Sequence, residues 1–148
     1  MTLLRLRQIA EQHGHPFSIV SEMLDVRKRD LAEVTRADDF IVSDQLVSLM
    51  LAQISENTEL ATVFDDLFDP EGSELYLKPA VDYVQLGRPV NFYTVVEAAK
   101  RRGEVAVGYR QYADSHNPLK SYGVRVHPAK SMLVTFADQD RIIVLAED

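Results

Sequence analysis

Four carboxylates that lie close together in the sequence are the first residues that could do chemistry. Asp65, Asp66, Asp69 and Glu71 fall within seven residues, at the predicted end of a short helix. Calcium takes several oxygen ligands from carboxylates and carbonyls, so these side chains could converge on one ion. A solvated acidic turn that begins at Asp69 explains the same residues more simply, and no EF-hand spacing is present. Calcium is therefore a candidate ligand, and no cofactor is predicted beyond it.

Two further acidic residues lie at the end of a predicted strand. Glu22 and Asp25 are found at the carboxyl end of the short apolar segment 17–24. Ligands commonly bind at the carboxyl edge of the strands in Rossmann-like sheets, so both residues are additional candidates for a metal site. Asp25 can equally cap the helix that follows it, and the sequence leaves both explanations open.

The residues needed for the common catalytic sites are missing or differently spaced. The chain contains no cysteine, which excludes disulfides, thiol catalysis and cysteine-bound metals. Its four histidines occur in no HExxH or comparable arrangement, and no GxSxG sequence is present. No glycine-rich GxGxxG turn, which would bind a dinucleotide phosphate, follows a strand. We therefore predict no enzymatic activity and no catalytic residues.

The composition indicates a globular protein with an acidic surface. Hydrophobic residues make up 46% and charged residues 26% of the 148 residues, which is typical of a chain that folds around a core. The net charge of −7 argues against a nucleic-acid partner, because phosphate binding requires clustered lysine and arginine. No run approaches the ~18 consecutive apolar residues of a membrane-spanning helix. The chain as given is expected to be soluble and cytoplasmic.

Helices and strands alternate in the first third of the sequence. After a helix that stops at Gly14, the pattern predicts a strand, a helix, a strand and a long helix over residues 17–24, 25–34, 39–42 and 44–57. This order is typical of parallel α/β units. Two strands are too few for an independent parallel sheet, so the segment resembles the back part of a Rossmann-like lobe whose other half is absent.

The sequence from residue 58 onward predicts a small α+β lobe. Thr58 is expected to cap a short helix, and Asn91 a second helix that stops at Gly103. Extended segments are predicted in residues 73–84, 104–111, 124–128 and 141–146. Residues 104–111 should alternate, with the odd-numbered side chains on one face of the strand and the even-numbered ones on the other.

The long helix after residues 39–42 carries more apolar surface than one contact requires. Its six large apolar residues cover about 200° of the helical wheel, whereas a helix packed on one side of a sheet needs a stripe of about 100°. A second surface must cover the rest, either the second lobe or another copy of the chain. We expect a homodimer in which the contact is made by Leu46, Leu49, Met50 and Ile54.

Three central blocks of the sequence resemble a known family. SEMLDVRKRDLAEV, DDFIVSDQLVSLMLAQISEN and FDDLFDPEGSELYLKPA are similar to the cytosolic region of the CASTOR/POLLUX ion channels and their bacterial relatives. The shorter pieces GYR and QDRIIVLAED extend the resemblance to the C-terminus. In that family the region is an RCK domain, a regulator of ion conductance. The resemblance implies an α/β plus α+β fold: the back part of a Rossmann-like lobe ending in a crossover helix (residues 1–57), then an RCK C-terminal α+β lobe (residues 58–148).

The resemblance also implies a role in ion transport. Domains of this kind would form a gating ring at the cytoplasmic face of the cell membrane, below the membrane pore domain of the full-length chain, and couple ligand or ion binding to the gating of a cation channel or transporter. Pore helices, a selectivity filter and the front Rossmann half are not present in this sequence, so we expect a fragment with Met1 as an artificial start. The alternative is a free-standing interaction module that oligomerises through the same helix and has no transport role.

Overall fold

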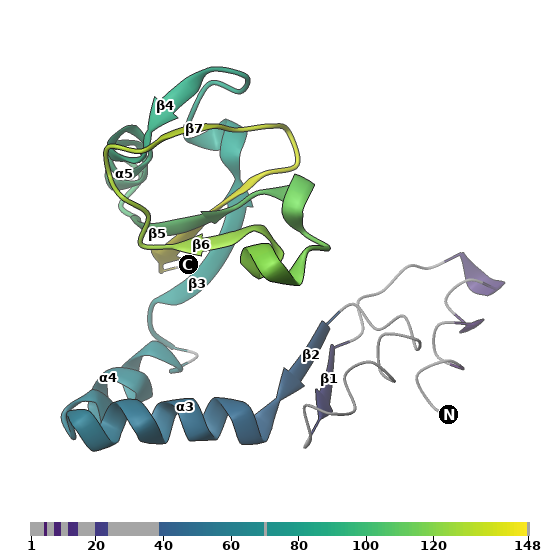
Figure 1. Ribbon diagram of the computed structural model, residues 1–148, viewed down its shortest axis with the longest axis vertical. Coiled ribbons are helices and arrows are strands. Elements are labelled where there is room, and N and C mark those ends of the chain that lie inside the picture. Colours follow the sequence, from purple (N-terminus) through teal and green to yellow (C-terminus); the bar gives the residue numbers. More distant parts are fainter. Residues whose placement is uncertain are drawn as a thin grey trace. The chain divides into compact units, whose positions relative to one another are not determined.

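The protein divides into two compact units, Met1–Ala61 and Thr62–Asp148, which are described separately. Figure 1 shows the order of the helices and strands along the chain in this computed structural model. The structure describes residues 5, 8–9, 12–14, 20–23, 39–69 and 71–147.

Two short strands of unit 1 (Met1–Ala61) form a parallel pair. β1 (Val20–Met23) and β2 (Asp39–Val42) are paired from their first residue to their last (Figure 1). Helix α3 (Ser43–Glu56) begins at the residue after β2, as the sequence predicts. The helix predicted in residues 25–34 lies outside the described residues. The parallel pairing and the helix that follows it confirm the α/β part of the predicted fold class.

A short turn separates α3 from helix α4 (Leu60–Leu67). The side chain of Asn57 starts this turn, because its Oδ1 accepts a hydrogen bond from the backbone N–H of Glu59 at 3.1 Å. Thr58, the predicted cap, accepts through its backbone carbonyl from the N–H of Ala61 at 3.3 Å. Asparagine and threonine both favour helix starts, so the composition of the turn predicts the helix but not which of the two side chains accepts from the backbone.

Unit 2 (Thr62–Asp148) is built on a four-stranded antiparallel sheet. The strand order is β3-β8-β5-β6. Their bounds are Glu74–Pro79 for β3, Val105–Arg110 for β5, Val124–Val126 for β6 and Arg141–Ala146 for β8. The segment predicted as extended over residues 73–84 is therefore a strand only to Pro79, after which the chain turns into the 3-10 helix η2 (Ala80–Asp82).

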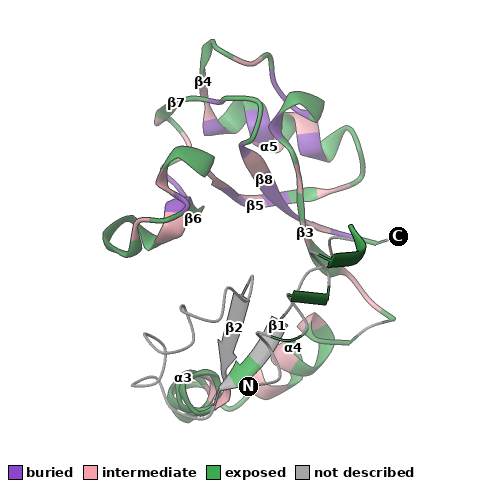
Figure 2. Cartoon of the chain, turned by 90° about the vertical axis from the view of Figure 1, so that its right-hand side faces the viewer, coloured by how far each residue is buried: buried purple, intermediate pink, exposed green. Residues whose placement is uncertain are grey.

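Helix α5 (Phe92–Lys100) and a two-stranded ribbon cover one side of this sheet, which we call the inner face (Figure 2). The ribbon pairs β4 (Pro89–Asn91) with β7 (Leu133–Thr135), and neither strand is predicted from the sequence. Two further 3-10 helices, η3 (Tyr112–Asp114) and η4 (Pro118–Gly123), occupy the predicted polar loop. Sheet, helix and ribbon together confirm the α+β part of the predicted fold class.

Helix α5 begins and ends where its sequence predicts. The Oδ1 atom of Asn91 accepts a hydrogen bond from the backbone N–H of Thr94 at 3.0 Å, which satisfies one of the free donors of the first turn. The helix stops before Gly103, whose positive φ of 76° lets the chain reverse without a Cβ clash. The apolar residues at helical spacing, Phe92, Val95 and Ala99, are all buried.

The predicted alternation along β5 is wrong because the strand contains a bulge. Ala106 and Tyr109 are both buried, although an odd and an even position should lie on opposite faces. The pairing with β8 shifts between Ala106 and Gly108, so Val107 is the extra residue of a β-bulge. The backbone carbonyl of Val107 accepts instead from the N–H of His127 at 2.8 Å. The bulge therefore turns Tyr109 toward the core.

The core of unit 2 lies between the inner face of the sheet and α5. The ring of Tyr109 is 6.1 Å from that of Phe92 and 5.5 Å from that of Phe136, measured between centroids. The rings of Tyr109 and Phe136 meet edge to face, the geometry that aromatic quadrupoles prefer. Ile142 and Val144 of β8 are fully buried against this cluster. These contacts join α5, β5 and β8 around one hydrophobic core.

Candidate functional site

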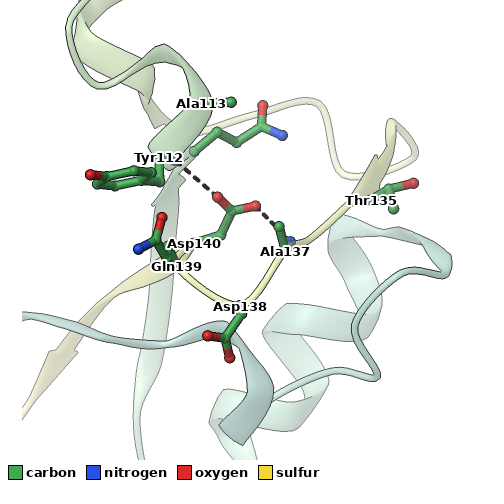
Figure 3. Close-up of a pocket in the computed structure, with 8 residues that line it drawn as sticks. Tyr112, Ala113, Thr135, Ala137, Asp138, Gln139 and Asp140 are labelled. Carbon is green, nitrogen blue, oxygen red and sulfur yellow. Dashed lines mark hydrogen bonds between the residues drawn. The ribbon is translucent and has the colours of Figure 1, made fainter.

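A pocket of about 590 Å³ lies in unit 2 between the end of β5 and the turn that joins β7 to β8 (Figure 3). At its base is Asp140, which is only 3% exposed. One carboxylate oxygen, Oδ1, accepts from the backbone N–H of Tyr112, and the other, Oδ2, accepts from that of Ala137, both at 2.9 Å. The residues that line the pocket are Gln111, Tyr112, Ala113, Thr135, Ala137, Asp138, Gln139 and Asp140.

Asp140 holds together three segments that are distant in the sequence. Besides the two bonds of its side chain, its backbone carbonyl accepts from the N–H of Ala80 at 3.0 Å, and that residue belongs to η2. A buried carboxylate is costly unless its oxygens are hydrogen-bonded, and both oxygens here have a backbone donor. Asp140 therefore fixes the shape of the pocket, whereas a ligand would contact the other side chains that line it.

The groups that the pocket offers to a ligand are aromatic, neutral polar and acidic. The ring of Tyr112 is about half exposed, and Thr135, Asp138 and Gln139 are exposed. Figure 3 shows the side chain of Asp138 directed away from the Asp140 carboxylate. None of the lining residues is a cation. The pocket is suited to an uncharged or cationic ligand that has a flat apolar part and hydrogen-bond donors.

The wall of the pocket at Gln111 depends on a tight approach of two chain segments. The N–H of Gln111 donates to the backbone carbonyl of Gly123 at 3.0 Å. A Cβ atom at Gly123 would collide with the carbonyl oxygen of Gln111, and the φ of Gly123 is 79°. Only glycine fits this position without strain. The sequence predicts a turn through residues 136–140 but does not indicate that Asp140 is buried or that this turn meets η3.

A second polar group of unit 2 surrounds the carboxylate of Glu104. Its Oε1 accepts from Lys78 Nζ at 2.8 Å and its Oε2 from the Tyr83 hydroxyl at 2.5 Å. Burial by itself would raise the pKa of Glu104, but the hydrogen bonds from Lys78 and Tyr83 outweigh it and hold this pKa below its usual value. Burial, together with the bond to Glu104, raises the pKa of Tyr83. The carboxylate thus stays ionised and joins β3, η2 and the start of β5.

An open pocket of about 710 Å³ lies beside this network, along α5. The guanidinium of Arg102 stacks 5.2 Å from the centre of the Tyr83 ring and donates to the carbonyl of Asp82 at 2.9 Å. Arg101 pairs with Glu97 one helical turn earlier, and both side chains are largely exposed. Arg101, Arg102 and Glu97 thus already have partners in the fold, so this pocket is a weaker candidate for ligand binding than the Asp140 pocket.

The predicted acidic cluster lies on the surface of a turn. Asp69 Oδ1 accepts from the backbone N–H of Glu71 at 2.9 Å, and the carboxylates of Asp65 and Asp66 are exposed on α4. Glu22 is exposed on β1, and Asp25 lies outside the described residues. In the part of the chain that the structure describes, no group of three or more acidic or histidine side chains is arranged to hold a metal ion. The calcium site stays a prediction.

Helix α3 leaves its apolar side chains uncovered within the described chain. None of its residues is buried, and Leu49 is 58% exposed (Figure 2). Of the four residues predicted to form an interface, Leu46 is also exposed, and Met50 and Ile54 are partly buried. Exposed aliphatic side chains on one helix indicate a surface for another molecule. The homodimer contact stays a prediction.

Over most of its length the chain is similar to plant proteins named as ion channels. It is 30% identical over 125 residues to the ion channel CASTOR of Lotus japonicus, which covers 82% of this chain and 15% of that protein. It is 38% identical over 129 residues to the probable ion channel SYM8 of Pisum sativum, which covers 86% of this chain and 14% of that protein. The chain thus spans 14% to 15% of the length of these two relatives.

Solved structures of GsuK are among those that match the chain. The RCK domain of GsuK matches with a TM-score of 0.39 and 15% identity, over 98% of this chain and 27% of that one. The GsuK channel bound to NAD matches with a TM-score of 0.40 and 13% identity, over 99% of this chain and 23% of that one. No family model matches the sequence.

Among the described residues, no helix is both long enough and apolar enough to cross a membrane. The relatives are named as ion channels, which agrees with the expectation that this chain is not an enzyme. The resemblance predicted from the three central blocks of sequence is confirmed by the identity along most of the chain. This protein is a relative of the CASTOR/POLLUX ion channels.

Proposed function

We propose that this chain is a regulatory, ligand-sensing region of a cation channel or transporter at the cytoplasmic face of the membrane. The observation that carries the proposal is the similarity to proteins named as ion channels, which covers 82% to 86% of the chain. In this proposal residues 1–57 form the partial Rossmann-like lobe with its crossover helix, and residues 58–148 form the C-terminal RCK lobe. Copies assemble into a gating ring beneath a pore that the rest of the full-length protein supplies.

The Asp140 pocket is the proposed place for a regulatory ligand. A ligand shifts a gate only to the extent that it binds one conformation more tightly than another. The walls of this pocket come from residues 111–113 and 135–140, so a ligand that bridges Tyr112 and Gln139 would hold the end of β5 against the β7–β8 turn. Ligand binding would in this way bias the position of segments that are far apart in the sequence.

Helix α3 is the proposed place for subunit contact. Its exposed side chains include Leu46 and Leu49, and covering each would contribute about 1.5 to 3 kcal/mol. A ring of regulatory domains requires contacts between its copies, and the exposed apolar side chains of α3 offer a surface for one. Burial of this face against another copy explains why so many apolar residues are found on a helix that buries none of them within the described chain.

Titration of the purified chain with calcium, magnesium and adenosine, by calorimetry and thermal shift, tests ligand sensing. A ligand present at 100 times its Kd should stabilise the fold by about 2.7 kcal/mol. An effect of adenosine, an uncharged flat ligand with hydrogen-bond donors, should be lost in Thr135→Val with Gln139→Ala, whereas an effect of calcium at the acidic turn should be lost in Asp65→Asn with Asp66→Asn. Each double variant is the control for the other. No heat and no shift with any of the three would reject ligand sensing by this chain.

The oligomeric state of Leu49→Glu, measured by light scattering, tests the contact through α3. We expect a smaller assembly, because a buried charge would replace an aliphatic side chain in the interface. Gln45→Glu, an exposed polar position on the same helix, is the matched control and should leave the assembly unchanged. If Leu49→Glu has the same oligomeric state and the same stability as the parent chain, α3 makes no such contact.

The alternative function is a free-standing interaction module that oligomerises through α3 and has no transport role. The two functions differ in what precedes the chain in its gene. Membrane-spanning helices and a front Rossmann half encoded upstream are expected under the channel proposal. Their absence from the complete coding sequence would favour the free-standing module.

A further inference from the structure

The four-stranded sheet of unit 2 has a second face that its own helix does not cover. Side chains at alternate positions point away from α5, and we call this side the outer face. Its aliphatic residues are well exposed for a sheet: Leu75 at 52% and Leu77 at 49% on β3, Val105 at 59% on β5 and Val126 at 63% on β6. A contiguous apolar patch of a few hundred Å² on a soluble unit marks an interaction surface.

The register of the strands shows that these residues are neighbours. Leu75 lies opposite Leu145 and Leu77 opposite Ile143, so the patch continues from β3 onto β8. Val105 also lies opposite Leu145, and Gly108 lies opposite both Ile143 and Val126, so the patch runs across β5 to β6. Ile143 at the centre of this face is only 7% exposed and Leu145 is partly buried, so the exposed aliphatic side chains are those on β3, β5 and β6 around them.

Charged residues are placed at the two ends of this surface with opposite sign. At one end, Arg110 and Arg141 lie directly opposite each other in the β5–β8 register. Like charges in this position repel, and among the described residues no ion pair joins either arginine to a carboxylate. At the other end, the alternation of β8 through Arg141, Ile143 and Leu145 leads to Glu147, which is exposed.

We propose that the outer face binds the outer face of a second copy of this chain, with the two-fold axis perpendicular to the strands. Aliphatic sheet faces stack about 10 Å apart in β-sandwiches. A two-fold axis perpendicular to the strands reverses their direction, so the paired arginines of one copy lie over Glu147 of the other. An axis parallel to the strands would instead place arginines over arginines. The charge pattern therefore favours a second copy of this chain as the partner, with its strands running in the opposite direction.

This contact is separate from the one proposed for α3, because its residues belong to β3, β5, β6 and β8. Each contact is a two-fold surface that binds its own kind, so a chain that has both should form an assembly larger than a dimer. A variant that removes one contact should leave a dimer held by the other. The two proposals can therefore fail independently.

Sedimentation of four full-length chains tests the proposal: the parent, Leu49→Glu, Leu75→Lys and the double variant. We expect the parent to form an assembly larger than a dimer, each single variant to form a dimer, and the double variant to be a monomer. Circular dichroism should show that all four chains are folded. Leu119→Lys is the control for added charge, since Leu119 is 96% exposed in η4 and lies off the sheet. A folded Leu49→Glu chain that is monomeric at high concentration would overturn the contact through the sheet. A parent dimer that only Leu75→Lys dissociates would support it and reject the contact through α3.

Charge reversal in the Leu49→Glu background tests the orientation. Glu147→Arg should weaken the dimer about tenfold, because the two-fold axis places the altered pair in the interface twice and each exposed pair is worth up to about 1 kcal/mol. Adding Arg110→Glu should recover part of the parent affinity, since the arginine introduced by Glu147→Arg in one copy would then meet a carboxylate beside Arg141 of the other. If Arg110→Glu deepens the loss instead, the copies are not arranged in this way.

Discussion

Helices α5 and α3 have opposite surroundings within the described chain. α5 has nine residues and buries Phe92, Val95 and Ala99 against the sheet of its own unit. α3 has fourteen residues and buries none. Both are amphipathic enough to be predicted from sequence, so the difference lies in what covers them. α5 stabilises a single unit, whereas the apolar side chains of α3 stay exposed or partly buried within the described chain, which is why we propose α3 as a contact surface.

Among the variants that test this difference between α5 and α3, truncation of Phe92 should cause the largest loss in the free energy of unfolding. Phe92→Ala removes a fully buried ring at the centre of the aromatic cluster, and we expect unfolding to become easier by about 3 to 5 kcal/mol. Leu49→Ala, measured by urea unfolding at a concentration where the chain is monomeric, should cost less than about 1 kcal/mol. Equal losses for the two variants would show that α3 is as well packed within one chain as α5.

Replacement of Glu104 should cause the next largest loss of stability, because Glu104 anchors the segment that follows α5. Its backbone N–H donates to the carbonyl of Ala99 at 3.0 Å, and its side chain binds Lys78 and Tyr83. Glu104→Gln should reduce the stability of unit 2 by about 1 to 3 kcal/mol, since the lysine and the phenol lose a charged acceptor. Glu97→Gln, an exposed pair with Arg101 on the same helix, is the control and should change the urea midpoint little.

Loss of the cap at the start of α5 should cost less. Asn91→Ala removes the acceptor for the N–H of Thr94, and we expect a loss of about 1 kcal/mol in thermal unfolding. Asn91→Ser should recover most of it, because a serine hydroxyl can accept from the same donor. A loss that serine does not recover would mean that Asn91 acts through its place in β4 and not through the cap.

The pH dependence of unit 2 should be the smallest of these effects. The folded pKa of Glu104 lies below its unfolded value of 4.5, so its contribution is complete above pH 4.5 and is lost as the pH falls through the folded pKa. The folded pKa of Tyr83 is raised, so its contribution is complete below pH 10 and is lost as the pH rises further. The difference in urea midpoint between the parent and Glu104→Gln should therefore shrink below pH 4.5.

Periodicity and capping residues predicted the helices and most strands because these signals are local. Asn91 and Gly103 delimit α5 where the sequence places them, and β2 occupies the predicted residues 39–42. The bulge at Val107 could not be predicted, because it depends on how β5 pairs with β8 and on the N–H of His127. The pocket at Asp140 was missed for the same reason. Its donors come from Tyr112 and Ala137, and sequence spacing does not show that these backbones meet.

The bonds of Asp140 also bear on the order in which unit 2 folds. Its side chain reaches Tyr112, 28 positions earlier, and its carbonyl reaches Ala80, which lies still farther back in the sequence. Contacts between distant residues form only after the entropy of closing the intervening loops has been paid, so they are expected late in folding. During synthesis on the ribosome, the pocket cannot form until Asp140, the residue before β8, has left the exit tunnel. A chain that displays this pocket has therefore already brought η2, η3 and the β7–β8 turn together.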